Sequence, residues 1–189
     1  MQPERLKMLI TSALFASIIG ILAQISIPLP FSPVPITGQT LAIGLAATIL
    51  GRKYGMISVL IYLAIGAIGV PVYAGFSAGF SALIGPTGGY LIGFIPTVLI
   101  IAYYIEKTSF TISQALIANT IGMLVTLTFG TIWLKIAMDL GWKAALTGGF
   151  YPFIILGLVK AYLAAAIGVI VKKRLEKANL LRSDSNIPA

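Results

Sequence analysis

Lys160 is the residue of this chain whose chemistry is hardest to explain by packing. It lies near the middle of residues 151–171 (YPFIILGLVKAYLAAAIGVIV), where every other residue is uncharged. Placing an ammonium at the centre of a membrane helix costs from ~3 kcal/mol on insertion scales to more than ~10 kcal/mol in simulations, so such a residue usually has a function and a partner. No carboxylate lies within eight residues of it in sequence. Its partner therefore comes from a distant segment or from an anionic ligand.

Polar and aromatic residues elsewhere in the chain are candidates to complete a ligand site around this lysine. A buried cation combined with hydroxyls, amides and rings suits a compact amphipathic ligand that has a carboxylate at one end and amide-like groups at the other. The candidates are Thr37, Gln39, Tyr73, Phe76, Thr87, Tyr90 and Asn119. Asp139 is a further candidate as a partner for a donor group of the ligand, and the alternative is that it offsets Lys143 locally.

The composition excludes several other kinds of site. The chain has no cysteine and no histidine, which excludes disulfides, cysteine nucleophiles and histidine metal ligands, and no metal site is expected. It has no G-x-x-x-x-G-K-[ST] phosphate-binding loop, so ATP-driven work would need another subunit as the motor. An intramembrane hydrolase would need a serine with Lys160 as its base, and Ser58, Ser77 or Ser81 would be the nucleophile. This alternative stays open beside a non-catalytic binding role and a purely structural membrane subunit.

The elements that position these residues are membrane helices. The mean hydropathy is +1.01, and 58% of residues are hydrophobic while only 10% are charged, against roughly 25% charged in soluble domains. The sequence predicts an all-α integral membrane protein that forms a single membrane domain over residues 1–189, with a cytoplasmic basic tail at 172–189. Six transmembrane helices are predicted at roughly 6–27, 37–51, 54–69, 88–105, 112–138 and 150–171.

The distribution of Lys and Arg predicts that both termini are cytoplasmic. With this orientation, ten of the thirteen basic residues flank the inner ends of the helices, and two lie outside. The inner ten are Arg5, Lys7, Arg52, Lys53, Lys107, Lys172, Lys173, Arg174, Lys177 and Arg182. Because the charges flank hydrophobic spans and leave no basic face free, nucleic acid is not expected as a partner.

The three outer connections, at residues 28–36, 70–87 and 139–149, are long and mostly apolar. Loops normally run solvated over a surface, so we expect these outer loops to fold down and cap a ligand pocket. The alternative is that they rest on the lipid headgroups.

Small residues recur every four positions in the first predicted helix and make a smooth face for close helix packing. They are Ser12, Ala13, Ala16, Ser17 and Gly20. This face packs either within the chain or against a partner subunit.

Five motifs resemble the BioY family, the biotin-specific S components of energy-coupling factor (ECF) transporters, and the match extends over roughly residues 6–171. The most specific is GPTGGYLIGF at 85–94. The others are PVPITGQT at 33–40, the Tyr62-Leu63 pair before Gly66, GVPVY at 69–73, and Pro152-Phe153 followed by Lys160-Ala161.

The resemblance implies a six-helix, non-catalytic membrane protein that needs no cofactor and binds biotin from the outside of a prokaryotic cell membrane with high affinity. It implies a transmembrane coupling subunit, met by the first helix, and two ABC-type ATPases as partners. The valerate carboxylate of biotin would then pair with Lys160. A different vitamin or precursor is the alternative ligand. The family often has an aspartate three residues before the lysine, where this chain has Gly157, so no role of that aspartate is carried over.

Overall fold

The computed structural model describes residues 3–178 and is built almost entirely of helices. Within this part of the chain, five helical stretches are long and apolar enough to cross a membrane. The elements in chain order are α1 (Pro3–Ala23), β1 (Ser26–Leu29), β2 (Ser32–Thr37), α2 (Gln39–Ala67), η1 (Ala74–Phe76), α3 (Phe80–Ile84), α4 (Gly88–Lys107), α5 (Ile112–Ala137), α6 (Trp142–Gly149) and α7 (Tyr151–Lys177).

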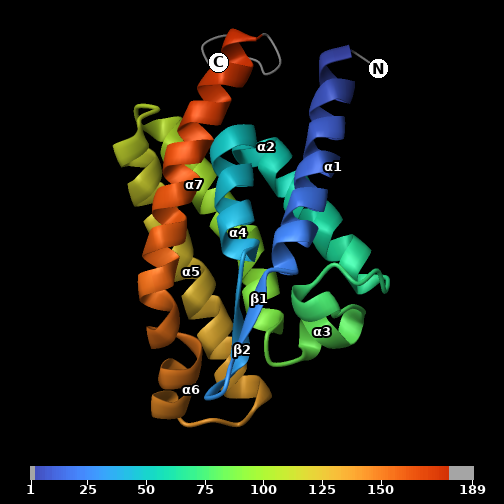
Figure 1. Cartoon of the computed structure of the whole chain (residues 1–189), viewed down its shortest axis with the longest axis vertical. Coiled ribbons are helices and arrows are strands. Elements are labelled where there is room, and N and C mark those ends of the chain that lie inside the picture. Colours follow the sequence, from blue (N-terminus) through green and yellow to red (C-terminus); the bar gives the residue numbers. More distant parts are fainter. Residues whose placement is uncertain (1–2, 179–189) are drawn as a thin grey trace.

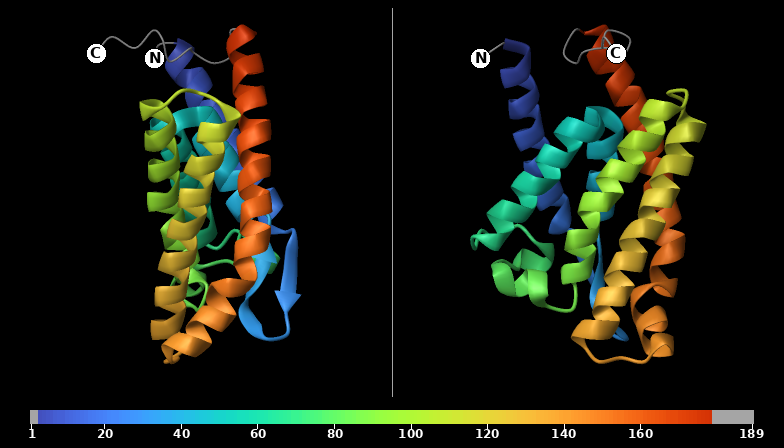
Figure 2. Two further views of the ribbon diagram at one scale, coloured as in Figure 1. Left: turned by 90° about the vertical axis from the view of Figure 1, so that its left-hand side faces the viewer. Right: turned by 180° about the vertical axis from the view of Figure 1, so that it is seen from behind.

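Helix α2 contains both the second and the third predicted spans. Its helical geometry breaks at Gly51, where φ is 72° and ψ is −171°. This conformation is readily accessible only to glycine. Figures 1 and 2 show that α2 turns back at this kink, so that its two arms run in opposite directions. The two spans predicted at 37–51 and 54–69 are therefore the arms of one kinked helix, each short because the chain reverses between them.

The kink is held by the end of α4. One carboxylate oxygen of Glu106 accepts a hydrogen bond from the backbone N–H of Arg52 at 3.1 Å, and the other lies 3.3 Å from the Arg52 guanidinium. Glu106 therefore caps the start of the second arm of α2. The ends of α1 and α7 that adjoin the termini lie at this same end of the molecule (Figure 1).

The opposite end carries the three connections that were predicted to lie outside, and each of them contains regular structure. Residues 28–36, predicted as a loop, belong to an antiparallel hairpin in which Ser26 pairs with Thr37 and Leu29 with Ser32. A two-stranded sheet has only edge strands, so it tolerates the prolines of this segment. The other two connections contain η1, α3 and α6, and Figure 1 places the hairpin, α3 and α6 together in the lower part of the view.

The last helix is longer than the sequence suggested. Helix α7 continues to Lys177, so the first residues of the predicted basic tail are helical. Residues 179–189, which include Arg182, lie outside the described part of the chain.

The small residues of α1 divide into two groups. Ser12, Ala16 and Gly20 are buried against the rest of the chain, and the Ser12 hydroxyl donates to the backbone oxygens of Met8 and Tyr54. Ala13 and Ser17 are exposed. The spacing that looked like one smooth face thus serves packing within the chain at three positions and leaves two positions facing outward.

Candidate functional site

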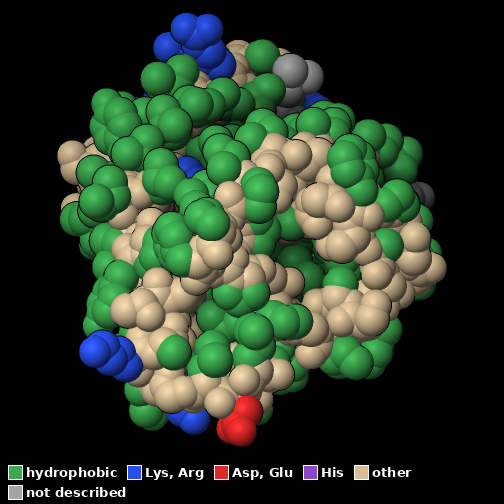
Figure 3. All heavy atoms as spheres, turned by 60° about the horizontal axis from the view of Figure 1, so that its bottom comes forward, with side chains coloured by type: hydrophobic (Ala, Val, Ile, Leu, Met, Phe, Trp, Pro, Cys, Tyr) green, Lys and Arg blue, Asp and Glu red, His purple; other side chains and the backbone are tan. Residues whose placement is uncertain are grey.

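A cavity of about 310 Å³ lies beside the hairpin, between α2, α4, α5 and α7. Figure 3 views this end of the molecule, which is mostly hydrophobic or uncharged and has a hollow near its centre. The described residues that line the cavity are Pro33, Val34, Pro35, Thr37, Gln39, Thr40, Tyr73, Ala74, Ser77, Thr87, Tyr90, Leu91, Phe94, Met123, Thr126, Leu127, Phe153, Gly157 and Lys160. Lys160 is the only charged side chain among them.

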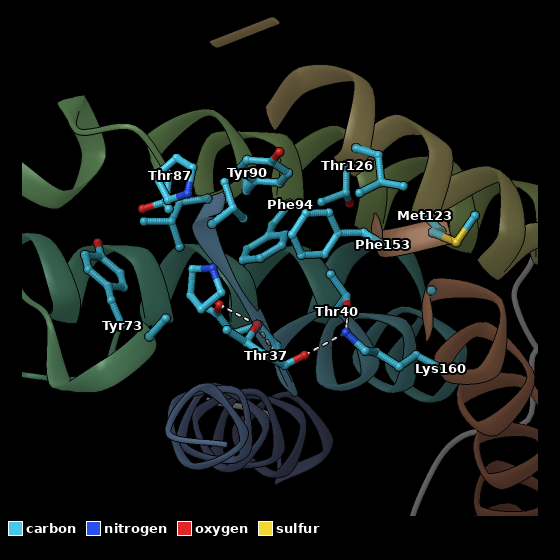
Figure 4. A pocket seen from close by; sticks show the side chains of 18 of the residues that line it. Thr37, Thr40, Tyr73, Thr87, Tyr90, Phe94, Met123, Thr126, Phe153 and Lys160 are labelled. Atoms are coloured by element: carbon cyan, nitrogen blue, oxygen red, sulfur yellow. Dashed lines mark hydrogen bonds between the residues drawn. The ribbon is translucent and has the colours of Figure 1, made fainter. Parts of the chain in front are cut away.

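The ammonium of Lys160 is held by neutral oxygens (Figure 4). Its Nζ donates to the backbone oxygen of Thr37 at 2.8 Å and to the hydroxyl of Thr40 at 3.2 Å. An ammonium has three donors, so these two bonds leave one donor for another acceptor. The partners of Lys160 within the chain therefore come from the end of the hairpin and the first turn of α2. Both are uncharged oxygens, so neither neutralises the charge of the ammonium.

A chain of hydrogen bonds extends from this lysine through the wall of the cavity. The Thr37 hydroxyl donates to the side-chain oxygen of Gln39 at 2.9 Å. The Gln39 amide nitrogen donates to the Tyr62 hydroxyl, which is buried. Because both ends of its amide are engaged, Gln39 presents a fixed orientation at the cavity edge.

Tyr90 is held on the opposite side of the cavity by two contacts. Its hydroxyl donates to the backbone oxygen of Gly149 at 2.7 Å, and its ring packs on Gly130, where a Cβ would collide with it. Thr87 precedes α4 and also lines the cavity. The glycines around Tyr90 therefore serve close packing.

Tyr73 forms the wall next to η1, and its placement depends on Gly66. Its ring is 1% exposed and occupies the space that a side chain at Gly66 would need. Its hydroxyl donates to the backbone oxygen of Leu63 at 2.6 Å, and burial raises its pKa above the ordinary value. Tyr73 is therefore a neutral, fixed ring.

Three residues predicted for the ligand site lie outside the cavity lining. Phe76 is 69% exposed and lies on a turn where its backbone has φ of 60°. Asp139 is exposed in the connection after α5. Asn119 is buried one layer below, where its amide nitrogen donates to Thr48 and to the backbone oxygen of Ala115. It lines a separate cavity of about 20 Å³ that shares Lys160 with the larger one.

Sequence reasoning missed most of the apolar lining. Helical spacing carries the signal, because residues three, four and seven positions apart share a face. The helix residues that face the cavity are Thr87, Tyr90, Leu91 and Phe94 near the start of α4, Met123, Thr126 and Leu127 on α5, and Phe153, Gly157 and Lys160 on α7. Extending this spacing from Tyr90 and Lys160 finds Phe94 and Phe153.

Gly157 has a packing reason of its own. A Cβ at this position would overlap the Met123 side chain. The space that a side chain at position 157 would need is therefore filled by the thioether of Met123 from α5.

The serine–lysine alternative is not supported by the contacts. The recorded hydrogen-bond partners of Lys160 are Thr37 and Thr40. Ser58 and Ser77 donate instead to the backbone oxygens of Tyr54 and Ala74, respectively.

Comparison with known proteins gives one consistent result. The chain is 37% identical over 179 residues to "Biotin transporter BioY2" of Lactococcus lactis subsp. cremoris (strain MG1363), covering 95% of this chain and 97% of that protein. It is 37% identical over 169 residues to "Biotin transporter BioY" of Thermotoga maritima, covering 89% and 97% of the two chains.

A solved structure has the same fold. The 2.1 Å crystal structure of the S-component for biotin from an ECF-type ABC transporter superposes with a TM-score of 0.84 at 31% sequence identity, covering 92% of this chain and 94% of that one. The sequence profile of the BioY family matches residues 1–177. The resemblance drawn from the motifs is confirmed: this chain is a multi-pass membrane protein that belongs to the BioY family.

Proposed function

We propose that this protein is the biotin-binding S component of an ECF-type uptake transporter. Its family, the names of its relatives and the solved biotin S-component structure support this function. The observation that carries it in this chain is Lys160, a single cation on the wall of an otherwise uncharged cavity, held in place by two neutral oxygens.

The cavity suits each part of biotin. The valerate carboxylate takes the remaining donor of Lys160, since a charge-assisted hydrogen bond is strong in a dry pocket. Gln39, Thr87 and Tyr90 are the candidates for contacts with the ureido group, and Tyr73, Phe94 and Phe153 form apolar walls. These residue roles are assigned from placement and chemistry.

The membrane arrangement follows from the charge distribution. We infer six crossings, one for each arm of α2 and one each for α1, α4, α5 and α7, in the plasma membrane of a prokaryote. Both termini are then cytoplasmic, because the ends of α1 and α7 that carry Lys and Arg lie on one side. The cavity faces the outside in this orientation.

Energy for uptake comes from partners in this proposal. A transmembrane coupling subunit docks on the outward positions of α1, Ala13 and Ser17, and two ABC-type ATPases supply the hydrolysis that this sequence lacks the phosphate-binding loop to perform. The S component itself is a non-catalytic binding protein without a cofactor.

Titration of the purified protein in detergent or nanodiscs tests the function. Trp133 is a suitable reporter, because its indole N–H donates to the backbone oxygen of Gly85 near the start of α4. A Trp142→Phe variant removes the other, exposed tryptophan and leaves Trp133 as the single signal. We expect saturable quenching or enhancement with biotin and none with thiamine, riboflavin or desthiobiotin methyl ester. Tighter binding of another vitamin than of biotin would assign a different ligand to the same fold.

A further inference from the structure

The turn that follows α2 forms part of the cavity wall and has an unfavourable backbone conformation. Tyr73, Ala74 and Ser77 line the cavity. Between them, Gly75 and Phe76 both have positive φ, 63° and 60°. Glycine adopts this conformation easily, but a bulky residue such as phenylalanine does so only when its surroundings hold it there.

Gln24 supplies this support from the end of α1. Its side-chain nitrogen donates to the backbone oxygens of Gly20 at 2.9 Å and Tyr73 at 3.2 Å. Its side-chain oxygen accepts a hydrogen bond from the backbone N–H of Phe76 at 2.9 Å. One amide group thus bonds to both the start and the end of the turn, and at the same time to the last turn of α1.

Tyr73 transmits the position of this turn to the ligand site. Its backbone N–H donates to the oxygen of Ser77 at 3.0 Å, which closes the turn. Its ring meets Tyr62 edge to face with centroids 5.5 Å apart, and Tyr62 accepts the hydrogen bond from Gln39. Release of the turn therefore loosens two cavity residues, Tyr73 directly and Gln39 through Tyr62.

We propose that Gln24 is a positioning residue for the ligand site: it holds the 73–76 turn in its left-handed conformation and so keeps the Tyr73 wall closed over the bound ligand. The ligand-binding part of this inference rests on the proposed function. Gln24 itself lines a different hollow, between α1 and the second arm of α2, and is absent from the lining of the ligand cavity. Because Gln24 directly follows α1, a displacement of α1 away from the turn breaks the same bonds.

The test compares Gln24→Met, which keeps the side-chain length and removes all three hydrogen bonds, with Thr128→Ala as a control. Thr128 is exposed on α5, and its hydroxyl donates to the preceding turn of its own helix, at the backbone oxygen of Leu124. Association and dissociation of biotin are measured by stopped-flow tryptophan fluorescence. We expect Gln24→Met to raise the dissociation rate about tenfold, since the turn loses the hydrogen bonds that hold it while the ligand keeps its own contacts, with association changed less than about twofold. Thr128→Ala leaves both rates unchanged.

The same substitution made in a Phe76→Gly background separates a role of Gln24 in positioning the turn from a general loss of stability. Phe76→Gly makes the left-handed turn intrinsically accessible, and it removes a side chain that is largely exposed. In that background, we expect Gln24→Met to raise the dissociation rate by less than about threefold. An unchanged dissociation rate in the single Gln24→Met variant overturns the proposal. So does an equal increase in the dissociation rate when Gln24→Met is made with and without Phe76→Gly. If Gln24→Met does not fold, Gln24→Asn, one methylene too short to bridge the turn, carries the same expectations.

Amide hydrogen exchange on the ligand-free protein keeps this inference separate from the proposed function. Gln24→Met should speed exchange of the Phe76 N–H by about tenfold or more, while amides in the middle of α4 are unaffected. Slow exchange at Phe76 in the variant overturns the positioning role whatever the ligand is. Failure of the wild-type protein to bind biotin, with the expected exchange pattern present, overturns the ligand assignment alone.

Discussion

Helix α7 carries two lysines that are shielded from solvent in different ways. Lys160 lies on the ligand cavity and donates to a backbone oxygen and a threonine hydroxyl. Lys172 is 6% exposed near the C-terminal end of the helix, and its ammonium lies 4.7 Å from the centroid of the Phe110 ring. The first is held by directional hydrogen bonds that leave a donor toward a cavity, whereas the second lies over an aromatic face beside the connection between α4 and α5.

If Lys160 binds the ligand as proposed, burial alone does not identify a functional charge. Lys172 lies five residues before the end of α7, and in the proposed membrane arrangement its long side chain stays close to the membrane boundary, where the cost of its charge is lower. Lys160 is in the middle of the helix, and the groups around it fix the direction of its donors. The proposed ligand role of Lys160 rests on the cavity and the remaining donor, and Lys172 is not among the residues that line this cavity.

Among the variants that test the comparison of the two lysines, Lys160→Met should have the largest effect, a loss of biotin affinity. The variant removes the only charge on the cavity wall, and loss of one partner of a buried charge pair costs about 3 kcal/mol, so biotin affinity should fall roughly 100-fold. Thermal stability should be maintained or increase, because an apolar side chain of similar volume needs no charge partner. Isothermal titration calorimetry and thermal unfolding in the same detergent measure the two quantities. Affinity equal to wild type would remove the carboxylate assignment.

The sequence predicted that Lys160 is a functional cation, but it did not predict the contacts that distinguish Lys160 from Lys172. The uncharged stretch around Lys160 predicted a functional cation, and the spacing of apolar segments predicted the helices of the bundle. The sequence could not show that Thr37 and Thr40, more than a hundred residues away, hold the ammonium. Such contacts depend on how the hairpin closes against α7, which local patterns do not encode.

Two residues predicted for the site lie outside the cavity lining for a similar reason. Phe76 and Asn119 have suitable chemistry, but Phe76 is exposed on a turn with positive φ, and a hydrogen bond to Thr48 holds Asn119 below the cavity. The kink at Gly51 depends on a carboxylate from another helix, Glu106. Residue type and spacing thus predicted the elements and the central residue, and backbone conformation decided which neighbours reach it.

Crowding the surroundings of Lys160 should give the next largest effect. Gly157→Ala places a methyl group where the Met123 side chain lies and pushes this side chain toward the cavity. Overpacking of this kind costs about 1–3 kcal/mol, and we expect biotin affinity to fall about tenfold. Met123→Ala in addition should recover most of the affinity, because it removes the atoms that collide. Binding measured for both single variants and the double variant gives the coupling, and an additive result would contradict the proposed contact.

Replacement of Lys172 by methionine should leave the ligand site intact. Loss of the cation–π contact with Phe110 should lower stability by about 1 kcal/mol, while biotin affinity stays within about twofold of wild type. Thermal unfolding measures the stability of this variant, and the calorimetric titration used for Lys160→Met measures its biotin affinity. A large loss of biotin affinity in this variant would erase the distinction between the two lysines.

Glu106→Gln tests the smallest effect, at the kink of α2, where the side chains of the Arg52–Glu106 ion pair are partly exposed. Surface ion pairs contribute about 0–1 kcal/mol, and the neutral amide can still accept the backbone N–H of Arg52, so we expect stability to fall by less than about 1 kcal/mol and biotin affinity to be unchanged. Glu106→Leu removes the acceptor as well and should cost more, since the second arm of α2 then begins without a cap. Thermal unfolding of both variants at low and high salt separates the ion pair, which salt screens, from the cap, which it does not. Equal losses in the two variants would mean that the charge, and not the hydrogen bond to the kink, holds the two arms of α2 together.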